Sequence, residues 1–458
     1  MDKPDIQHLY NRAGFGIGPD RLAAIASTRR KKIVEALFVD SKIPRPLKIP
    51  TPEIDKHLAT KPMDRKSKTF RELVKKSRRK HVIFNRAWVD RMAGTQQDLR
   101  ERMTLFWANH FVMRSNNIIF SQQFNNTLRT NALGNFKDFV LAIAKEPGML
   151  DYLNNQQNKK GAPNENFARE LMELFTLGVG NYSETDIKEA ARAFTGWRHD
   201  AQGKFRKAQR QHDEGEKTFL GNTGNFDGED IISLILERPA CADFIARKVY
   251  RHFVNETVNE AHVAAIAKVF FKDYDISNMM RFIFDSDWFY AKENVRSKIK
   301  SPVDLLVGLM RVVPFTWQKP QQLKYVERLL GQVLLEPPNV AGWAEGRNWI
   351  DANTMMVRLK LPSVLLKNGT IAFDVKGEFE DSFEAFNKKN NFNRKLDIGA
   401  KWEQFDAKYG KLKGETLVFL LLGDSVSTET KAFLETLEAE GQQDFCIQLM
   451  SLPEYQLC

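Results

Sequence analysis

Acids, amides and one guanidinium group recur at helical spacing in the segment N-E-N-F-A-R-E-L-M-E-L-F-T-L-G, residues 164–178. Asn166, Arg169, Glu170 and Glu173 occupy positions i, i+3, i+4 and i+7, which places them on one stripe of a helix. Two carboxylates in this arrangement can act as acid and base or bind a cation, while a guanidinium group can hold an anion. The alternative is an ordinary solvated face with an Arg169–Glu173 ion pair.

The residues at both ends of this stripe indicate where the helix begins and ends. Asn164 follows a Gly-Ala-Pro turn and is a favourable N-cap, because its side chain can accept a hydrogen bond from a free backbone N–H group. Gly178 is a typical helix terminator. We expect Asn164, Asn166 and Arg169 to contact a substrate if this helix lines a cleft.

A histidine joins an apolar stripe in an earlier segment, L-R-E-R-M-T-L-F-W-A-N-H-F. Leu99, Met103, Phe106 and His110 follow 4-3-4 spacing, so the imidazole is expected to point into the core with the apolar side chains. A buried imidazole needs a hydrogen-bond partner. His110 is therefore either a satisfied core histidine or a ligand or proton-transfer group.

Residues 203–221 are the best β-hairpin candidate, with Phe205 on one arm and Thr218 and Phe219 on the other. Charged residues crowd the second arm. We expect Lys217 on this arm to help hold the anionic part of a substrate.

The sequence offers a weak indication of a metal site. His212 and Asp213 are adjacent, so on a strand they point to opposite faces and make a poor bidentate pair. One of them can still complete a site with carboxylates of the polar helix, and Glu170, Glu173 and Asp213 are the expected ligands of a divalent metal ion. No H-E-x-x-H, G-x-S-x-G, phosphate-loop or dinucleotide motif occurs, so no other cofactor is indicated.

Tryptophans provide a second type of candidate binding group. Residues 331–350 form a Pro/Gly-rich loop that carries Asn339, Trp343 and Trp349, and Trp197 follows the glycine that ends an earlier helix. Exposed tryptophans can stack on a sugar or a base. The alternative is that these large aromatic rings fill the core.

The net charge of +11 is concentrated near the amino terminus. Residues 61–80 contain ten Lys or Arg and only two Asp or Glu. Such a tract can bind a polyanion, or it can be a solvated helix face. Nucleic acid is not favoured, because Phe70 is the only aromatic residue in the tract. The three cysteines lack the spacing of a disulfide framework or a structural zinc site.

Helical periodicity dominates the chain, which predicts a mainly α fold: a large multi-helix globular unit with a small β-hairpin insertion. We expect a main helical domain over 1–368, with a basic helix at about 68–93 and the hairpin at about 203–221. Residues 369–412 are polar and indicate a linker or insertion. Residues 413–458 are expected to form a C-terminal helical segment that packs back on the main domain.

Several short blocks together resemble one known family. They are N-R-A-G-F-G (11–16), R-M-T-L-F-W-A-N-H-F (102–111), G-A-P-N-E-N-F-A-R-E-L-M-E-L-F-T-L-G (161–178), E-A-A-R-A-F-T-G-W (189–197), H-D-E-G-E-K-T-F-L-G (212–221), S-P-V-D-L (301–305), P-P-N-V-A-G-W (337–343) and P-E-Y-Q (453–456). In this order they are similar to the bacterial family known as domain of unknown function 1800, across nearly the whole chain.

The resemblance implies a large helical bacterial protein without an assigned biochemistry. Genes of this family often lie beside those of secreted, alkaline-phosphatase-like proteins with a twin-arginine signal, which implies a phosphatase-like protein partner. The chain has no apolar stretch of membrane-spanning length and no signal-peptide pattern, so a cytoplasmic location is expected. Co-export to the periplasm is the alternative.

Two hypotheses for function follow from these patterns. The first is a hydrolase-like enzyme that acts on an acidic polymer or a glycan. In one form of this hypothesis the enzyme depends on a metal ion. Its acid, base or metal groups would be His110, Glu170, Glu173, His212 and Asp213, and its substrate would be held by Asn164, Asn166, Arg169, Arg192, Trp197, Lys217, Asn339, Trp343 and Trp349. The second is a non-catalytic binding or scaffold protein that holds a polyanion, a glycan or an acidic partner.

Overall fold

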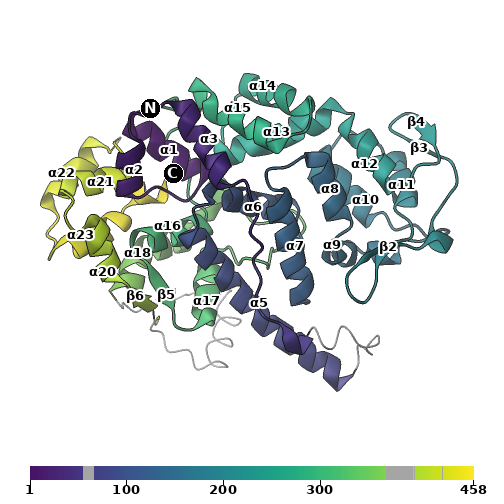
Figure 1. Ribbon diagram of the computed structural model, residues 1–458, viewed down its shortest axis with the longest axis horizontal. Coiled ribbons are helices and arrows are strands. Elements are labelled where there is room, and N and C mark those ends of the chain that lie inside the picture. The colour runs from purple at the N-terminus through teal and green to yellow at the C-terminus, as the bar shows by residue number, and fades with distance from the viewer. Residues whose placement is uncertain (55–66, 368–395, 397, 425) are drawn as a thin grey trace.

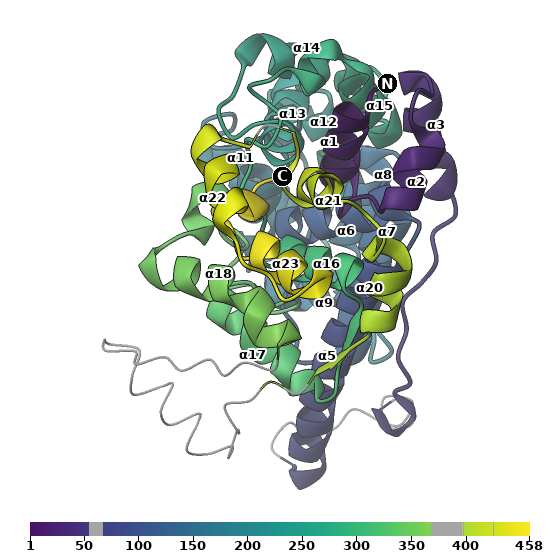
Figure 2. The ribbon, with the colours of Figure 1, turned by 90° about the vertical axis from the view of Figure 1, so that its left-hand side faces the viewer.

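The computed structural model describes residues 1–54, 67–367, 396, 398–424 and 426–458. The predicted fold class is confirmed, because helices dominate and the strands form small two-stranded antiparallel sheets. The termini lie close together on one flank of the body, where N-terminal and C-terminal helices meet (Figures 1 and 2). No described helix has both the length and the apolar character needed to cross a membrane.

The first of two large clusters of buried apolar side chains joins the N-terminal helices to the central part of the chain. Its α-helices are α1 (Lys3–Ala13), α2 (Pro19–Ile25), α3 (Arg30–Asp40), α6 (Asp98–His110), α7 (Ile118–Asn131), α8 (Phe136–Ala144), α9 (Pro147–Tyr152), α10 (Asn166–Glu170), α11 (Glu184–Ala193), α12 (Gly228–Leu236), α13 (Pro239–Phe253), α14 (Glu260–Phe271) and α15 (Ile276–Asp285). Short 3₁₀ turns η1 (Asn155–Gln157), η3 (Gln209–Gln211) and η4 (Asp287–Tyr290) connect them, and the π-helical segment η2 (Leu171–Thr176) continues α10.

The second cluster joins α5 (Lys68–Gly94) to the C-terminal third of the chain. Its further elements are α16 (Pro302–Val312), α17 (Pro320–Leu330), η5 (Gly346–Trp349), α18 (Ala352–Leu366), α20 (Trp402–Tyr409), α21 (Gly414–Leu422), α22 (Thr428–Thr436), α23 (Gln442–Met450) and η6 (Pro453–Gln456). The α6 helix contributes side chains to both clusters and therefore lies between them.

Side-chain caps explain where several helices begin. Ser183 and Asp186 form a reciprocal capping box at α11, as expected for a hydroxyl followed three residues later by an acid. Thr95 and Asp98 have the same spacing but form no box, because α6 begins after Gln97, whose backbone N–H donates to the Thr95 hydroxyl at 2.9 Å.

The predicted hairpin over 203–221 is replaced by two separate hairpins. Strand β1 (Trp197–His199) pairs with β2 (Phe205–Lys207), and β3 (Lys217–Phe219) pairs with β4 (Asn222–Gly224). Each pair closes on a tight turn with a glycine at positive φ, Gly203 in the first and Gly221 in the second. Because both turns are local, Phe205 faces His199 across the ladder and not Thr218 or Phe219.

The predicted basic helix is confirmed as α5, whose first turns extend beyond the body of the molecule (Figure 1). In the segment expected to be a polar linker or insertion, residues 369–395 and 397 lie outside the described residues. Its remaining part is folded: β6 (Ile398–Ala400) pairs with β5 (Phe315–Trp317), and α20 follows it. The C-terminal helices contact the N-terminal ones, since the Gln7 amide donates to the carbonyl groups of Phe419 and Leu420.

Candidate functional site

The polar stripe of the central helix begins close to its predicted start. The α10 helix starts at Asn166, and the Asn164 side chain accepts a hydrogen bond from the Asn166 N–H at 3.1 Å. Arg169 does not pair with Glu173. Its guanidinium group instead binds Glu184 at 2.8 Å and Glu165 at 3.1 Å, so two carboxylates already neutralise the cation that was expected to hold a substrate.

Glu170 and Glu173 lie near each other on the turn where α10 becomes π-helical. Burial and the nearby charge of Glu173 raise the pKa of Glu170. Glu173 accepts a hydrogen bond from the Tyr182 hydroxyl at 3.2 Å. In the described part of the chain, however, no group of three His, Cys, Asp or Glu residues is arranged to hold a metal ion. The expected set of Glu170, Glu173 and Asp213 is therefore not assembled.

His110 lies against the carbonyl end of the same helix, in a buried position. Its Nε2 is 3.0 Å from the Phe175 carbonyl oxygen, and the Lys248 ammonium group is 3.3 Å from its Nδ1. Burial and the charge of Lys248 hold the pKa of His110 well below its usual value, so the ring is neutral. This is the arrangement of a satisfied core histidine.

The charged groups of the hairpin region mainly bind one another. Arg192 binds Asp213 at 2.9 Å and Glu189 at 2.8 Å, and its hydrogen bond lowers the pKa of Asp213 to about 2. The buried Lys217 ammonium donates to the backbone carbonyl groups of Asp213 and Gly215. His212 is also buried, with Nδ1 at 2.9 Å from the Thr195 carbonyl oxygen. These side chains organise a loop, and the two cations predicted to hold a substrate, Arg192 and Lys217, are both occupied by protein groups.

The tryptophans expected to stack on a ligand are core residues. Trp197 is 1% exposed, and Trp343 and Trp349 are each 6% exposed. Asn339 and Asn166 are exposed, and Asn339 caps its own turn by accepting from the Ala341 N–H. The structure thus distributes the predicted binding residues over the core and separate surfaces.

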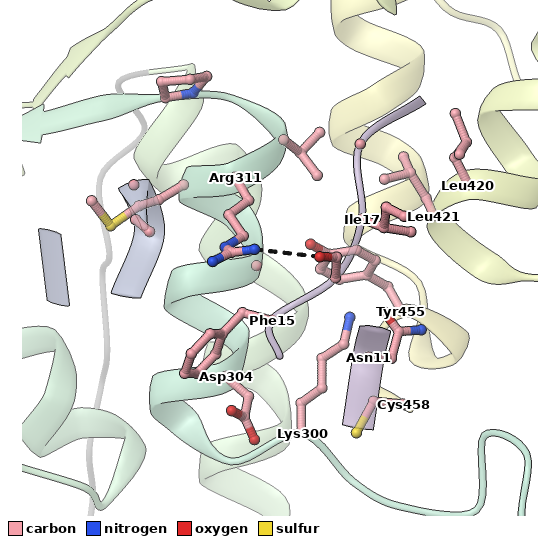
Figure 3. A pocket seen from close by; sticks show the side chains of 18 of the residues that line it. Asn11, Phe15, Ile17, Lys300, Asp304, Arg311, Leu420, Leu421, Tyr455 and Cys458 are labelled. Carbon is pink, nitrogen blue, oxygen red and sulfur yellow. Dashed lines mark hydrogen bonds between the residues drawn. The ribbon is translucent and has the colours of Figure 1, made fainter. Parts of the chain in front are cut away.

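A cavity of about 540 Å³ lies elsewhere, where α16 meets α1, α21 and the C-terminal turn (Figure 3). We call it the α16 pocket. Among the described residues, its polar lining includes six cations, Arg102, Arg296, Lys300, Arg311, Lys401 and Lys408, two carboxylates, Asp90 and Asp304, and neutral groups such as Asn11 and Tyr455. None of these residues was predicted to form a site.

Two of the pocket arginines are fixed by the protein itself. Arg102 binds Asp304 at 2.5 Å and donates to the Gly14 carbonyl group at 2.8 Å. Arg311 binds Asp98 at 2.5 Å and donates to the Met92 carbonyl group at 2.8 Å. Both guanidinium groups lie over the ring of Phe15, at 4.3 and 5.5 Å from its centroid. The two arginines therefore form a fixed part of the α16 pocket wall, and their charges are neutralised by Asp304 and Asp98.

Lys300 differs from these arginines. Its backbone is held on both sides, because its N–H donates to the Gln456 carbonyl group at 2.8 Å and its own carbonyl group accepts from Arg358. Its side chain extends into the pocket, with Nζ 3.6 Å from the centroid of the Tyr455 ring (Figure 3). Within the described residues, this ammonium group has neither an ion-pair partner nor a hydrogen-bond acceptor. Burial lowers the pKa of Lys300 to about 7.

One signal in the sequence points to this pocket. Four of the blocks that carry the family resemblance, far apart along the chain, contribute to its lining through Asn11 and Phe15, Arg102, Asp304, and Tyr455. Lys300 stands directly before the S-P-V-D-L block. The convergence of these separate blocks marks the site, whereas no catalytic motif in the sequence does.

No curated protein and no solved structure matches this chain. A family model does match, from residue 8 to residue 457, and therefore covers nearly all of both clusters and all of the residues that line the α16 pocket except Gln7 and Cys458. The chain belongs to the family described as Protein of unknown function (DUF1800).

Proposed function

We propose that this protein binds a small anionic ligand, bearing a carboxylate or a phosphate, in the α16 pocket, and that the Lys300 amine is its main recognition group. The observation that carries this proposal is the Lys300 side chain, which lines a cavity of about 540 Å³ without a protein acceptor among the described residues. Lys300 is half-buried, a cation withdrawn from water without a partner is costly, and an anion that enters the pocket supplies the missing partner.

The other charges around the pocket favour the same class of ligand. Arg296 donates to the Glu454 carbonyl group, and no described carboxylate pairs with it, with Lys401 or with Lys408. The two side-chain carboxylates of the lining, Asp304 and Asp90, are already bound to Arg102 and Arg86. The pocket therefore presents an excess of positive charge. An acidic ligand was among the ligands considered in both hypotheses from the sequence, and the enzyme hypothesis placed it on the central helix.

The test is calorimetric titration of the full chain with inorganic phosphate and with succinate, at low ionic strength. We expect saturable binding of at least one probe. A charge-assisted hydrogen bond contributes about 1.5–3 kcal/mol, so Lys300→Met should weaken binding by roughly 10-fold to 100-fold. Since the folded-state pKa of Lys300 is about 7, the ammonium form is lost as the pH rises through 7, and affinity should decrease from about pH 6 to pH 8.

The matched control is Lys137→Met, which removes one exposed ammonium group from α8, outside the pocket lining. It changes the net charge by the same amount, so it should leave the affinity within about twofold of that of the unmodified chain. Absence of saturable binding by both probes, or an equal loss of affinity in the two variants, would refute the proposal.

A further inference from the structure

We propose that Lys300 is a nucleophilic amine that forms an imine with an oxo acid bound in the α16 pocket. This inference rests on the anion-binding function proposed above and adds a reaction to it. The ligand would carry an aldehyde or ketone carbon next to its anionic group. The anionic group would be held by cations of the pocket, and its carbonyl carbon would be placed at the lysine nitrogen.

The contacts of other lysines single out Lys300. Burial also lowers the pKa values of Lys217, Lys248 and Lys298, so a shifted pKa alone does not mark a reactive amine. Each of these three donates to at least one backbone carbonyl group of the protein: Lys217 to Asp213 and Gly215, Lys248 to Leu174, and Lys298 to His252. Lys300 is the member of this set whose amine has no acceptor among the described residues and borders the large cavity.

The position of the Lys300 amine is well defined for an attack. The backbone hydrogen bonds to Gln456 and from Arg358 fix the base of the side chain directly before the N-cap of α16. The Tyr455 ring supports one side of the ammonium group. Lys300 also lines the cavity, so a ligand bound there can bring its carbonyl carbon to the nitrogen.

The charges that face Lys300 determine how much of the neutral amine is present. Burial is the main cause of the lowered pKa, and the positive charges of Arg296 and Arg358 act in the same direction. Cys458 and Asp304 oppose them, and so does the Tyr455 ring, because a ring face stabilises a cation. With a pKa of about 7, roughly half of the amine is neutral at pH 7, compared with about one in 2,500 for an ordinary lysine.

The reaction is balanced within the pair of reactants. The nitrogen lone pair of neutral Lys300 attacks the carbonyl carbon, and the carbon–oxygen π electrons move to oxygen to give a carbinolamine after proton transfer from nitrogen. Loss of the second nitrogen proton and of the hydroxyl group releases water and leaves a carbon–nitrogen double bond. No electrons enter or leave, so neither an oxidant nor a reductant is required.

The experiment is reductive trapping on the full chain. The protein is incubated with a limiting amount of glyoxylate and sodium cyanoborohydride, and carboxymethylated lysines are located by peptide mapping with mass spectrometry. We expect Lys300 to be modified at least about tenfold faster than exposed lysines at pH 7, because its larger neutral fraction outweighs its lower basicity. Its labelling rate should level off above about pH 7, whereas the rates of exposed lysines should continue to rise towards pH 10.

A competition arm separates this inference from the binding proposal. Excess inorganic phosphate should slow the labelling of Lys300 and leave that of the exposed Lys137 unchanged, which would support both proposals. If phosphate binds in a Lys300-dependent manner but glyoxylate labels Lys300 no faster than Lys137, the imine proposal is refuted and anion binding stands. Preferential labelling that phosphate does not slow, in a chain that binds neither phosphate nor succinate, supports the reactive amine and overturns the anion-binding function.

Discussion

Replacement of Asp304 by asparagine tests whether the wall of the α16 pocket depends on a buried ion pair. Asp304 binds Arg102 at 2.5 Å, and their side chains are only 12% and 6% exposed. Burial alone would raise the pKa of Asp304, but Arg102 and the hydrogen bonds from Ser301 lower it, so the carboxylate is charged at neutral pH. Asparagine is nearly isosteric and can still accept from the Ser301 N–H, so the main change is the loss of charge.

The expected loss follows from the burial of the pair. Removing one partner of a buried ion pair costs about 3–5 kcal/mol, because the other charge stays buried without compensation. Arg102 keeps its hydrogen bond to the Gly14 carbonyl group, so we expect the lower end of this range, about 3 kcal/mol, for Asp304→Asn. The free energy of unfolding is measured by urea denaturation at pH 7, followed by tryptophan fluorescence and circular dichroism.

Glu184→Gln is the matched control for this measurement. Glu184 binds Arg169 at 2.8 Å with the same chemistry, but its side chain is 69% exposed. An exposed ion pair contributes about 0–1 kcal/mol, so this variant should unfold at nearly the same urea concentration as the unmodified chain. A loss below about 1 kcal/mol for Asp304→Asn, or equal losses in the two variants, would refute the reasoning from burial.

Two further predictions concern other buried groups. Burial raises the pKa of Glu327 to about 8, so the folded chain binds one proton more than the unfolded chain between about pH 4.5 and pH 8, and stability must fall as the pH rises through this window. Glu327→Gln should remove up to about 1.4 kcal/mol per pH unit of that slope, measured by urea denaturation at several pH values, and an unchanged slope would contradict the assignment. Gly342→Ala should lower the free energy of unfolding by about 2 kcal/mol or more, because φ is +92° and the added methyl group would overlap with Asn109; a thermal unfolding midpoint equal to that of the unmodified chain would refute it.

Local features of this fold could be predicted from the sequence, because they depend on residues within a few turns of one another. The α5 helix begins at Lys68 after the Ser67 cap, and the α11 capping box forms as its sequence indicates. The apolar stripe that ends at His110 is buried. The prediction of a single hairpin was wrong because the tight turns at Gly203 and Gly221 were not recognised, although these turns are also local features.

The site could not be predicted, because whether a charged side chain is available for a ligand depends on contacts far along the chain. Arg169 and Arg192 appear as candidate anion-binding groups in the sequence, yet Glu184 and Asp213, 15 and 21 residues away, neutralise them. Lys300 belongs to no recognised catalytic motif. It becomes notable only when folding places it beside Tyr455, 155 residues later in the chain, and leaves its amine without an acceptor among the described residues.

The interior behind the α16 pocket gives a physical reason for the choice of an anion. Arg358, which donates to the Lys300 carbonyl group, and Arg12 are almost fully buried, with exposures of 0% and 3%, and burial lowers the pKa of each to about 10. Both keep buried guanidinium nitrogen atoms that have no hydrogen-bond partner among the described residues. The acidic groups whose charges oppose this lowering of the pKa are Cys458, Asp304 and, at Arg12, Glu256, and Asp304 is already bound to Arg102. A protein interior with this excess of positive charge is stabilised by an anion and destabilised by a cation, because the Coulomb energy is largest where water is excluded. A neutral ligand would leave the excess uncompensated, so an anion is the ligand class that the arrangement of Lys300, Arg12 and Arg358 favours.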